Sequence, residues 1–221
     1  MASNFGKTIQ VATFGASHGY AIGGIVEGLP CGHTIDIDEL QAFLKRRAPG
    51  QNQLQTQRKE ADIPEFLSGM VDGMLSGSPL AFMIRNTSQH SGDYNNLRDI
   101  PRPSHADFTA RMRYGDKVDM RGGGHFSARL TAPLCVAGGI ALQLLREKGI
   151  EIHGHLKQVG TIQDTPIDMV HPDMKALAKI ATETIAMVDA DKRSEVENLV
   201  MKLKKDGDST GGIEIGRASC R

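Results

Sequence analysis

The sequence predicts a mixed α/β (α+β) fold, on three observations. Short runs with strand composition recur in the first half of the chain, beginning at residues 8–14 and 22–27. A long apolar run at 132–145 has the length and the Ala and Leu content of a buried helix rather than a strand. Residues 189–206 repeat apolar side chains at i, i+3, i+4 and i+7, the spacing of an amphipathic helix. With 221 residues and no internal repeat, the chain is expected to form one domain.

Charge and composition exclude several classes of protein. The 26 basic residues equal the 26 acidic ones, so the overall charge favours neither nucleic acid nor an acidic membrane as a partner. The chain has no Trp and only 5% aromatic residues, which leaves few rings for stacking on bases. Three cysteines without metal-binding spacing fit a reducing compartment, and the N-terminus lacks the apolar core of a signal peptide. The apolar run at 132–145 is shorter than a membrane span. We therefore expect a cytoplasmic protein without membrane segments.

The first half of the chain is expected to alternate strands, polar loops and two helices. The predicted strands lie at residues 8–14, 22–27, 66–71 and 80–85, and the polar loops at 51–62 and 86–104. Asp36 or Asp38 can cap a helix that runs to about Arg47 and ends before Pro49. A short helix is expected at 106–114. The loop at 86–104 is long for a compact domain, and such loops are often functional.

The second half is expected to contain a strand at 150–159, the helix at 189–206 and a turn that enters a new strand at Ile213. Residues 214–219 resemble a sequencing adapter translated in frame. We therefore predict a single domain over residues 1–213 and a non-native tail over 214–221, with a native protein that continues past Ile213. Sequencing the source locus checks this, and a stop codon directly after the codon for Arg221 would contradict it.

The stretch at 121–131, with three glycines in a row before the apolar helix, is a candidate anion site. Glycine lets the backbone approach a ligand closely, and a helix N-terminus offers unpaired N–H groups to an anion. Arg121, His125, Ser127 and Arg129 could surround that anion with donors. The alternative, a glycine loop that only lets the helix pack closely, remains open at this point.

Arginines are the more informative group of charged residues. Those at loop mouths or element ends are Arg46, Arg47, Arg58, Arg102, Arg121 and Arg129. Guanidinium groups match phosphate and carboxylate with two parallel hydrogen bonds. If these side chains converge, their ligand carries several negative charges. The alternative is a scattered, solvated surface.

Histidines and one serine motif offer further chemistry. His18, His105 and His125 lie in loops bounded by Gly or Pro, where an imidazole can act as a general acid or base, although each also has a structural interpretation. Residues 15–19 match G-x-S-x-G, the nucleophile elbow of α/β-hydrolases, with Ser17 as nucleophile. That motif requires a following helix, whereas residues 22–26 have strand composition. No histidine group has the spacing of a metal site, so no metal is predicted.

Taken together, five motifs resemble the chorismate synthase family. Residues 14–19 match the family's GESHG-like turn, and residues 46–50 match its RRRPG-like helix end. Residues 85–87 and 91–94 form the third motif. Residues 102–107 match its RPGHAD loop, and residues 121–131 match its RGGGHFSGRLTAP segment. Five motifs in the right order and spacing are far more specific than any one of them. The resemblance covers nearly all of residues 8–212 and stops short of the family's C-terminal part.

The resemblance implies a layered β-α-α-β sandwich of the chorismate synthase type, incomplete at the C-terminus, and a homotetramer. The implied activity is that of a lyase of the shikimate pathway, in aromatic amino-acid biosynthesis. It is the 1,4-anti elimination of phosphate from 5-enolpyruvylshikimate 3-phosphate to give chorismate. The family requires reduced FMN, and some members reduce the flavin themselves with NADPH. A substrate with a phosphate and two carboxylates would account for many arginines in a neutral chain.

Site residues follow from the resemblance, position by position. His18 is implied as the acid that assists phosphate departure, and His105 as the group that protonates or holds the reduced flavin. The implied substrate-binding residues are Ser17, Arg47, Arg102, Ser127 and Arg129. The implied cofactor-binding residues are His125, Phe126 and Ser127 for the flavin, with Arg47 at a position linked to NADPH.

Departures from the family pattern bear on activity. Ala16 replaces the usual Glu, Ser104 replaces the Gly before His105, and Gln53 stands where many members have an Arg linked to NADPH. The C-terminal Arg/Asp motif that completes the family's flavin site is missing. Two other functions therefore remain open: a non-catalytic flavin- or phosphate-ligand-binding fragment, and a serine hydrolase.

Overall fold

The computed structural model describes residues 3–50, 54, 60–87, 100–168 and 170–220, and the chain divides into two compact units. Unit 1 comprises residues 1–51 and 57–144, and unit 2 comprises 52–56 and 145–221. Each unit has its own sheet and its own hydrophobic core. The predicted mixture of helices and strands, an α+β fold, is confirmed.

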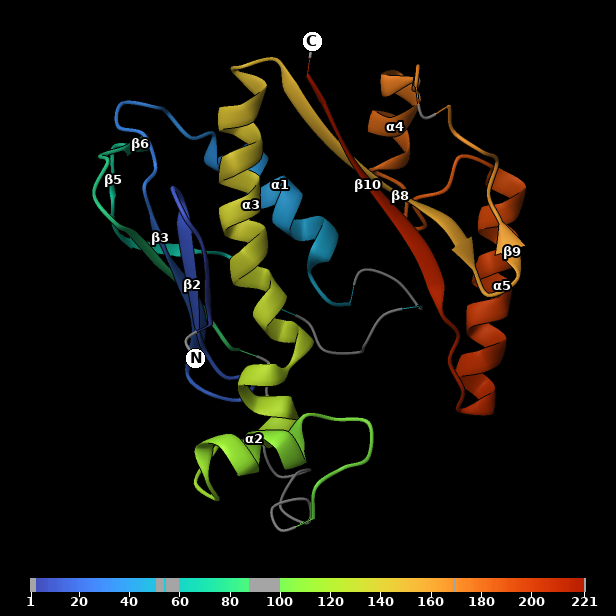
Figure 1. Ribbon diagram of the computed structural model, residues 1–221, viewed down its shortest axis with the longest axis horizontal. Helices are drawn as coiled ribbons and strands as arrows, with labels where there is room; N and C mark the ends of the chain where they lie inside the picture. Colours follow the sequence, from blue (N-terminus) through green and yellow to red (C-terminus); the bar gives the residue numbers. More distant parts are fainter. Residues whose placement is uncertain (1–2, 51–53, 55–59, 88–99, 169, 221) are drawn as a thin grey trace. The chain divides into compact units, whose positions relative to one another are not determined.

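Unit 1 is built on a five-stranded antiparallel sheet (Figure 1). In spatial order its strands are β1 (Asn4–Gly6), β2 (Gln10–Gly15), β3 (Ala21–Glu27), β7 (Leu80–Arg85) and β4 (Glu65–Ser68). In β7 the side chains of Leu80, Phe82 and Ile84 are buried while those between them are not, as expected for a strand with one face on a core. The predicted strands at 8–14, 22–27 and 80–85 are thereby confirmed within one or two residues.

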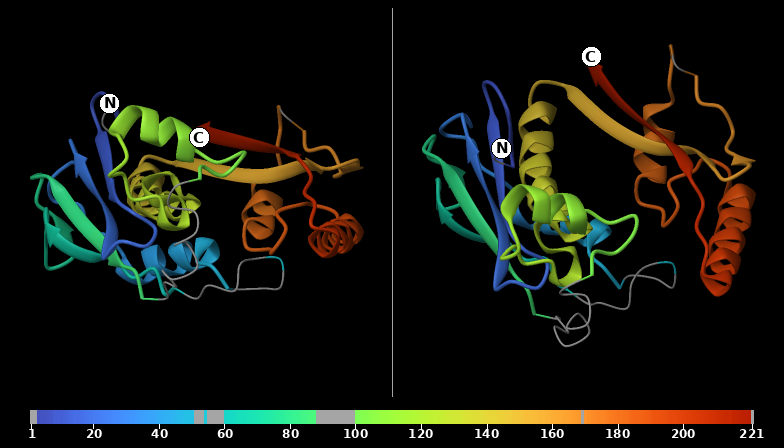
Figure 2. Two further views of the ribbon diagram at one scale, coloured as in Figure 1. Left: turned by 90° about the horizontal axis from the view of Figure 1, so that it is seen from below. Right: turned by 60° about the horizontal axis from the view of Figure 1, so that its bottom comes forward.

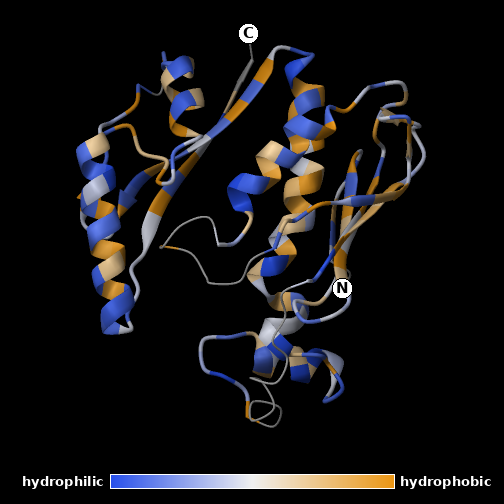
Figure 3. Cartoon of the chain, turned by 180° about the vertical axis from the view of Figure 1, so that it is seen from behind, coloured by the Kyte–Doolittle hydropathy of each residue, from blue (hydrophilic) through white to orange (hydrophobic). Residues whose placement is uncertain are grey.

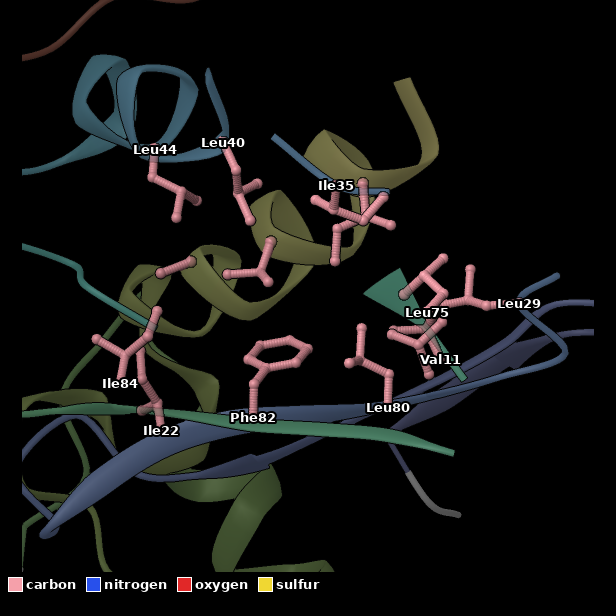
Figure 4. Packing of buried hydrophobic residues seen from close by; sticks show 14 of the residues in the cluster. Val11, Ile22, Leu29, Ile35, Leu40, Leu44, Leu75, Leu80, Phe82 and Ile84 are labelled. Carbon is pink, nitrogen blue, oxygen red and sulfur yellow. The ribbon is translucent and has the colours of Figure 1, made fainter. Parts of the chain in front are cut away.

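Two helices cover the inner face of this sheet: α1 (Ile37–Arg47) and α3 (Thr131–Arg146). The Asp36 carboxylate accepts a hydrogen bond from the Glu39 N–H at 2.8 Å, so the predicted cap of α1 is confirmed. Figure 4 shows Ile22 and Phe82 pointing from the sheet toward the helices, where Leu40 and Leu44 lie on α1. This packing forms the main core of unit 1.

Four shorter elements complete unit 1. They are the hairpin of β5 (Met70–Val71) and β6 (Met74–Leu75), the helix α2 (Asp107–Tyr114), and two 3-10 turns, η2 (Arg121–Phe126) and η3 (Ala128–Leu130). Figure 2 shows α2 beside the turns that lead into α3. By length and composition alone, Arg121–Arg146 could cross a membrane. However, three glycines interrupt its first part, and Val136 and Ile140 are fully buried in the core, as in the central helix of a globular unit.

Unit 2 consists of a three-stranded antiparallel sheet in the order β10 (Gly212–Cys220), β8 (Ile150–Val159) and β9 (Ile162–Gln163), with two helices. The helices are α4 (Met174–Ile180) and α5 (Ala190–Asp206). Figure 3 shows hydrophobic and hydrophilic residues alternating around α5, and Val196 on its inner side is buried in the core of this unit. The strand at 150–159 and the helix at 189–206 were predicted, whereas α4 was not.

Residues 214–220, which the sequence suggests are foreign, form most of β10. The strand pairs with β8 from Gly212 opposite Val159 to Cys220 opposite Ile150, and its register shifts between Ile213 and Glu214. Backbone pairing needs no particular side chains, so a foreign segment can form this strand as well as a native one. The single domain over 1–213 and the non-native tail stay predictions.

Candidate functional site

The site is organised around the three glycines that interrupt η2, residues 122–124. Their φ angles are 60°, 88° and 55°, in the left-handed region that residues with a Cβ rarely adopt. A Cβ on Gly124 would lie 1.9 Å from the backbone oxygen of Asp119. The Gly124 carbonyl accepts a hydrogen bond from the Ser17 N–H at 3.0 Å. The glycines therefore let this loop close tightly against the turn between β2 and β3.

That turn carries Ser17 and His18, and both residues are buried, with His18 only 9% exposed. The backbone of Gly122 lies directly against the two side chains. A Cβ built on Gly122 would fall 2.3 Å from His18 Cδ2, 2.5 Å from His18 Nε2 and 3.1 Å from Ser17 Oγ. The glycine loop and the serine–histidine turn, far apart in sequence, are thus one structural unit.

His125 fastens the loop to the sheet. Its Nδ1 is 2.8 Å from the carbonyl oxygen of Gly15, and its Nε2 is hydrogen-bonded to the Ser3 hydroxyl. A carbonyl can only accept, so Nδ1 donates to Gly15, while the Ser3 hydroxyl can pair with Nε2 as donor or acceptor. Both ring nitrogens of His125 are therefore used inside the protein.

Phe126 and Ser127, the other two residues of the predicted flavin stretch, differ in their surroundings. Phe126 is 44% exposed. The Ser127 side chain accepts a hydrogen bond from the Arg129 N–H at 3.3 Å and so caps η3. Of the three residues, Phe126 offers the largest open surface.

Two of the predicted arginines meet at one carboxylate. The side chain of Asp62 is fully buried, and its two oxygens pair with Arg47 Nη1, at 2.5 Å, and with Arg129 Nη1. Arg129 is 4% exposed, whereas the side chain of Arg47 is 22% exposed. Glu60 Oε2 lies 4.0 Å from Arg129 Nη2 and adds a second negative charge. The four residues form a compensated cluster in which only Arg47 reaches solvent to a useful degree.

Asn86 links this cluster to the serine–histidine turn. Its Oδ1 accepts a hydrogen bond from Arg129 Nε at 3.1 Å. Its Nδ2 donates to the carbonyl of Ala16 at 3.1 Å and to that of Gly19 at 2.8 Å. Ala16 and Gly19 flank Ser17 and His18 in the sequence. The arginine cluster, the turn and the glycine loop are therefore connected by continuous hydrogen bonds and packing.

Arg102 and His105 lie in the segment just before α2. Arg102 forms a fork onto Asp107, with Nε 2.8 Å from Oδ2 and Nη2 3.0 Å from Oδ1. The hydrogen bond from Arg102 holds the pKa of the Asp107 carboxyl below its usual range. His105 is exposed. The structure thus brings together Ser17, His18, Arg47, Ser127 and Arg129, and it places Arg102 and His105 on a neighbouring segment.

Arg121, expected among the donors around an anion, is turned toward Asp119. The two side chains form a fork, with Nε–Oδ1 at 2.9 Å and Nη2–Oδ2 at 2.8 Å. This hydrogen bonding lowers the pKa of Asp119, and the Asp119 carboxylate in turn raises the pKa of Arg121. The pair is half exposed.

A cleft of about 590 Å³ opens between α2 and Phe126. Its lining residues are Phe108, Thr109, Met112, Arg113 and Phe126. The ring centroid of Tyr114 lies 6.1 Å from that of Phe126, at the border of the cleft. Apolar side chains with one guanidinium suit a planar ring system that carries negative charge, and the volume is in the range of cofactor sites.

The geometry bears on two other kinds of site, a serine hydrolase and a metal centre. A nucleophile elbow needs a strand, a sharp turn and a helix, but residues 15–19 join the antiparallel strands β2 and β3. The serine hydrolase is therefore not favoured. Within the described ranges, no group of three His, Cys, Asp or Glu side chains could hold a metal ion.

Three residues of the site escaped sequence analysis: Glu60, Asp62 and Asn86. The segment at 51–62 was interpreted only as a polar loop, and most of it lies outside the described residues. A usable signal was the presence of arginines near an apolar helix, because a buried guanidinium requires a buried carboxylate partner. Asn86 stood in a recognised motif without a role.

A family model described as chorismate synthase matches residues 9–218. Chorismate synthases from Lancefieldella parvula and Bacteroides thetaiotaomicron are 41% and 44% identical to the chain, each over 96% of its length. The chain spans 59% and 58% of those relatives, less than two thirds of their length.

A crystal structure of chorismate synthase resembles the fold, with a TM-score of 0.68 and 24% sequence identity. It matches 96% of this chain, which covers 58% of that structure.

Proposed function

Because the chain belongs to the chorismate synthase family, we propose that its site serves the 1,4-anti elimination of phosphate from 5-enolpyruvylshikimate 3-phosphate to give chorismate. One observation supports this most strongly. A buried histidine, a serine hydroxyl and a pair of arginines, drawn from three segments of the chain, are linked to a glycine loop by contacts and hydrogen bonds. A loop that only lets a helix pack closely does not require a histidine, a serine and two arginines to be gathered beside it.

In this proposal Arg47 is the cation that meets the substrate's negative charge. Its guanidinium is part-exposed and is already oriented by Asp62 and by Thr131 Oγ1, 3.1 Å from its Nε. A preoriented guanidinium loses little freedom on binding a phosphate or carboxylate. Arg129 is buried against Asp62, so we assign it the support of Arg47 and of the serine–histidine turn. Arg102 would contribute from the segment before α2.

His18 and Ser17 act on the leaving phosphate. In the elimination the carbon–oxygen bond to phosphate breaks, a ring proton leaves, and a new carbon–carbon double bond forms. The imidazole of His18 donates a proton to the departing phosphate oxygen, and the Ser17 hydroxyl donates a hydrogen bond to it. Both groups stabilise negative charge that grows as the bond breaks. The tight contact with Gly122 keeps the His18 ring in place during this step.

Reduced FMN is the cofactor of this proposal, and the residues around Phe126 fit it. The cleft beside Phe126 offers apolar walls for a ring system and Arg113 for a negative charge. When bound, the reduced flavin would supply an electron or take the ring proton that leaves. His125, Phe126 and Ser127 would hold it, and His105 would supply or hold its proton. NADPH at Arg47 is the proposed source of reducing power.

Three further properties are part of the proposal: a place in the shikimate pathway, a cytoplasmic location and a homotetrameric assembly. The relatives' names support the first. The sparse cysteines without metal-binding spacing support the second, and the resemblance to the family supports the third. Size-exclusion chromatography with light scattering tests the assembly.

One assay separates the proposed functions. The 221-residue chain and the product of the native open reading frame are each supplied with anaerobically reduced FMN and 5-enolpyruvylshikimate 3-phosphate. Chorismate and phosphate released in equal amounts are expected. Absence of turnover by the native product would contradict the proposal. Binding of flavin and substrate without turnover would favour a non-catalytic flavin- or phosphate-ligand-binding protein. Labelling of Ser17 by a fluorophosphonate probe would revive the serine hydrolase.

A further inference from the structure

The side chain of Asn86 is hydrogen-bonded both to Arg129 and to the turn that carries Ser17 and His18. Its side-chain oxygen accepts from Arg129 Nε at 3.1 Å, while its nitrogen donates to the Ala16 and Gly19 carbonyls at 3.1 and 2.8 Å. The orientation of the amide is fixed by its partners, because a guanidinium can only donate and a carbonyl can only accept. Asn86 is 9% exposed, so all three hydrogen bonds are largely shielded from water.

The side of this amide that faces Arg129 is rigid. Arg129 is paired with Asp62, whose side chain is fully buried and which also holds Arg47. Asp62 has a left-handed backbone with φ of 51°, a conformation that a surrounding network must maintain. Removing one partner from such a buried charged cluster is costly, so the cluster provides a fixed anchor.

The nitrogen of the amide donates hydrogen bonds to both ends of the turn that carries Ser17 and His18. The Gly19 N–H also donates to the Ala16 carbonyl at 3.0 Å, which closes a four-residue turn with Ser17 and His18 at its centre. Holding the first and last carbonyls of a turn sets the direction in which its central side chains project. The Asn86 amide is therefore a direct link between the arginine cluster and His18.

We propose that Asn86 is a positioning residue that transmits the rigidity of the Arg47–Asp62–Arg129 cluster to His18, so that its imidazole stays aimed at the leaving phosphate. This inference rests on the proposed elimination, because His18 is the acid of that reaction. Asn86 itself touches neither substrate nor cofactor in this scheme. Its loss would leave the binding groups in place and misdirect the acid.

Two variants separate the two ends of the amide. Asn86→Leu keeps a similar volume and removes all three hydrogen bonds. Asn86→Asp keeps an oxygen for Arg129 and replaces the donor that faces the two carbonyls. The matched control is Thr87→Val at the next residue, which removes the hydroxyl hydrogen bond to Glu60 Oε2, 2.7 Å long, without touching the turn. All three changes disturb the same buried cluster, and only the first two disturb the turn.

The first readout needs no activity. Hydrogen exchange of the Ser17 and Gly19 amides is measured by NMR on the 221-residue chain. Both Asn86 variants are expected to accelerate exchange at these two amides by about 10-fold or more, whereas Thr87→Val leaves them within about 3-fold of the unmodified chain. Equal exchange in Asn86→Leu and Thr87→Val would overturn the proposal.

The second readout is steady-state kinetics with reduced FMN and the phosphate substrate. We expect both Asn86 variants to lower kcat about 10- to 100-fold with KM within about 3-fold, because a misdirected acid affects the chemical step. The limb of the pH profile that disappears in His18→Gln is expected to move in both variants and to stay in place in Thr87→Val. Wild-type kcat and pH profile in Asn86→Asp would contradict the proposal. If the native product shows no turnover, the proposed function fails, and the exchange data alone decide the role of Asn86.

Discussion

The backbone of Gly122 rests against the imidazole of His18, so closely that a Cβ at this position would lie 2.3 Å from His18 Cδ2. Gly122 also has a φ of 60°, so the position excludes a side chain on two independent grounds. This contact joins the glycine loop to the turn that carries the proposed acid.

Gly122→Ala is therefore expected to displace His18 and to lower the rate of phosphate release by about 10-fold or more. Rates are measured with reduced FMN under anaerobic conditions, and the position of the His18 ring is followed by its NMR resonances. Gly138→Ala, where a Cβ meets nothing within 4 Å, is the control. An unchanged rate and unchanged His18 resonances in Gly122→Ala would show that the contact is not required.

Replacing Gly138 or Gly139, which are adjacent in α3, by alanine is predicted to change the free energy of unfolding in opposite directions. Gly138→Ala adds a methyl group in open space and removes the helix penalty of glycine, so we expect a gain of about 0.5–1 kcal/mol in the free energy of unfolding. A Cβ on Gly139 would lie 2.5 Å from Leu40 Cδ1 and 3.1 Å from Phe43 Cδ1. Gly139→Ala is expected to cost about 1–3 kcal/mol through overpacking. Urea denaturation of both variants tests this, and equal effects would contradict the packing of α3 on α1.

Ser104 stands where the resemblance to the family implies glycine, and its φ is 61°. A left-handed conformation costs a residue with a Cβ about 1–2 kcal/mol. Glycine avoids this strain but loses more chain entropy on folding, so the substitution is expected to recover only part of that energy. Ser104→Gly is expected to raise the melting temperature slightly, while Ser104→Ala, which keeps the strain, does not. A lower melting temperature for Ser104→Gly would indicate that the serine hydroxyl has a stabilising role here.

Asp107 is predicted to make stability depend on pH at the acidic end. Arg102 lowers the pKa of Asp107 below 3.8 in the folded chain, so the carboxylate stabilises the fold above that pH. This contribution is lost as the pH falls through the lowered pKa. Asp107→Asn should be less stable than the unmodified chain near pH 7, and the difference should shrink as the pH falls through the lowered pKa of Asp107. Thermal unfolding across this range measures it, and a difference that does not vary with pH would contradict the ion pair.

The secondary structure could largely be predicted because the local signals are strong. The strand composition of residues 80–85, the aspartate cap of α1 and the apolar spacing along α5 depend on neighbouring residues only. By contrast, α4 has only seven residues, too few to show a clear helical period.

The site was predictable only in part, since its partners are distant in sequence. Motifs indicated Ser17, His18, Arg47, Ser127 and Arg129, which the structure indeed connects. Asp62 lies 67 residues from Arg129 along the chain, and no local pattern could pair them. The placement of Arg102 and His105 beside α2 likewise depends on tertiary structure.

The central claim is that His18 protonates the phosphate that leaves. Its most direct test is the rate of phosphate release from 5-enolpyruvylshikimate 3-phosphate with reduced FMN, compared between the unmodified protein and His18→Ala. We expect the variant to be slower by about 100-fold or more, with His105→Ala lowered to a similar extent through the flavin. A wild-type rate in His18→Ala would contradict the account.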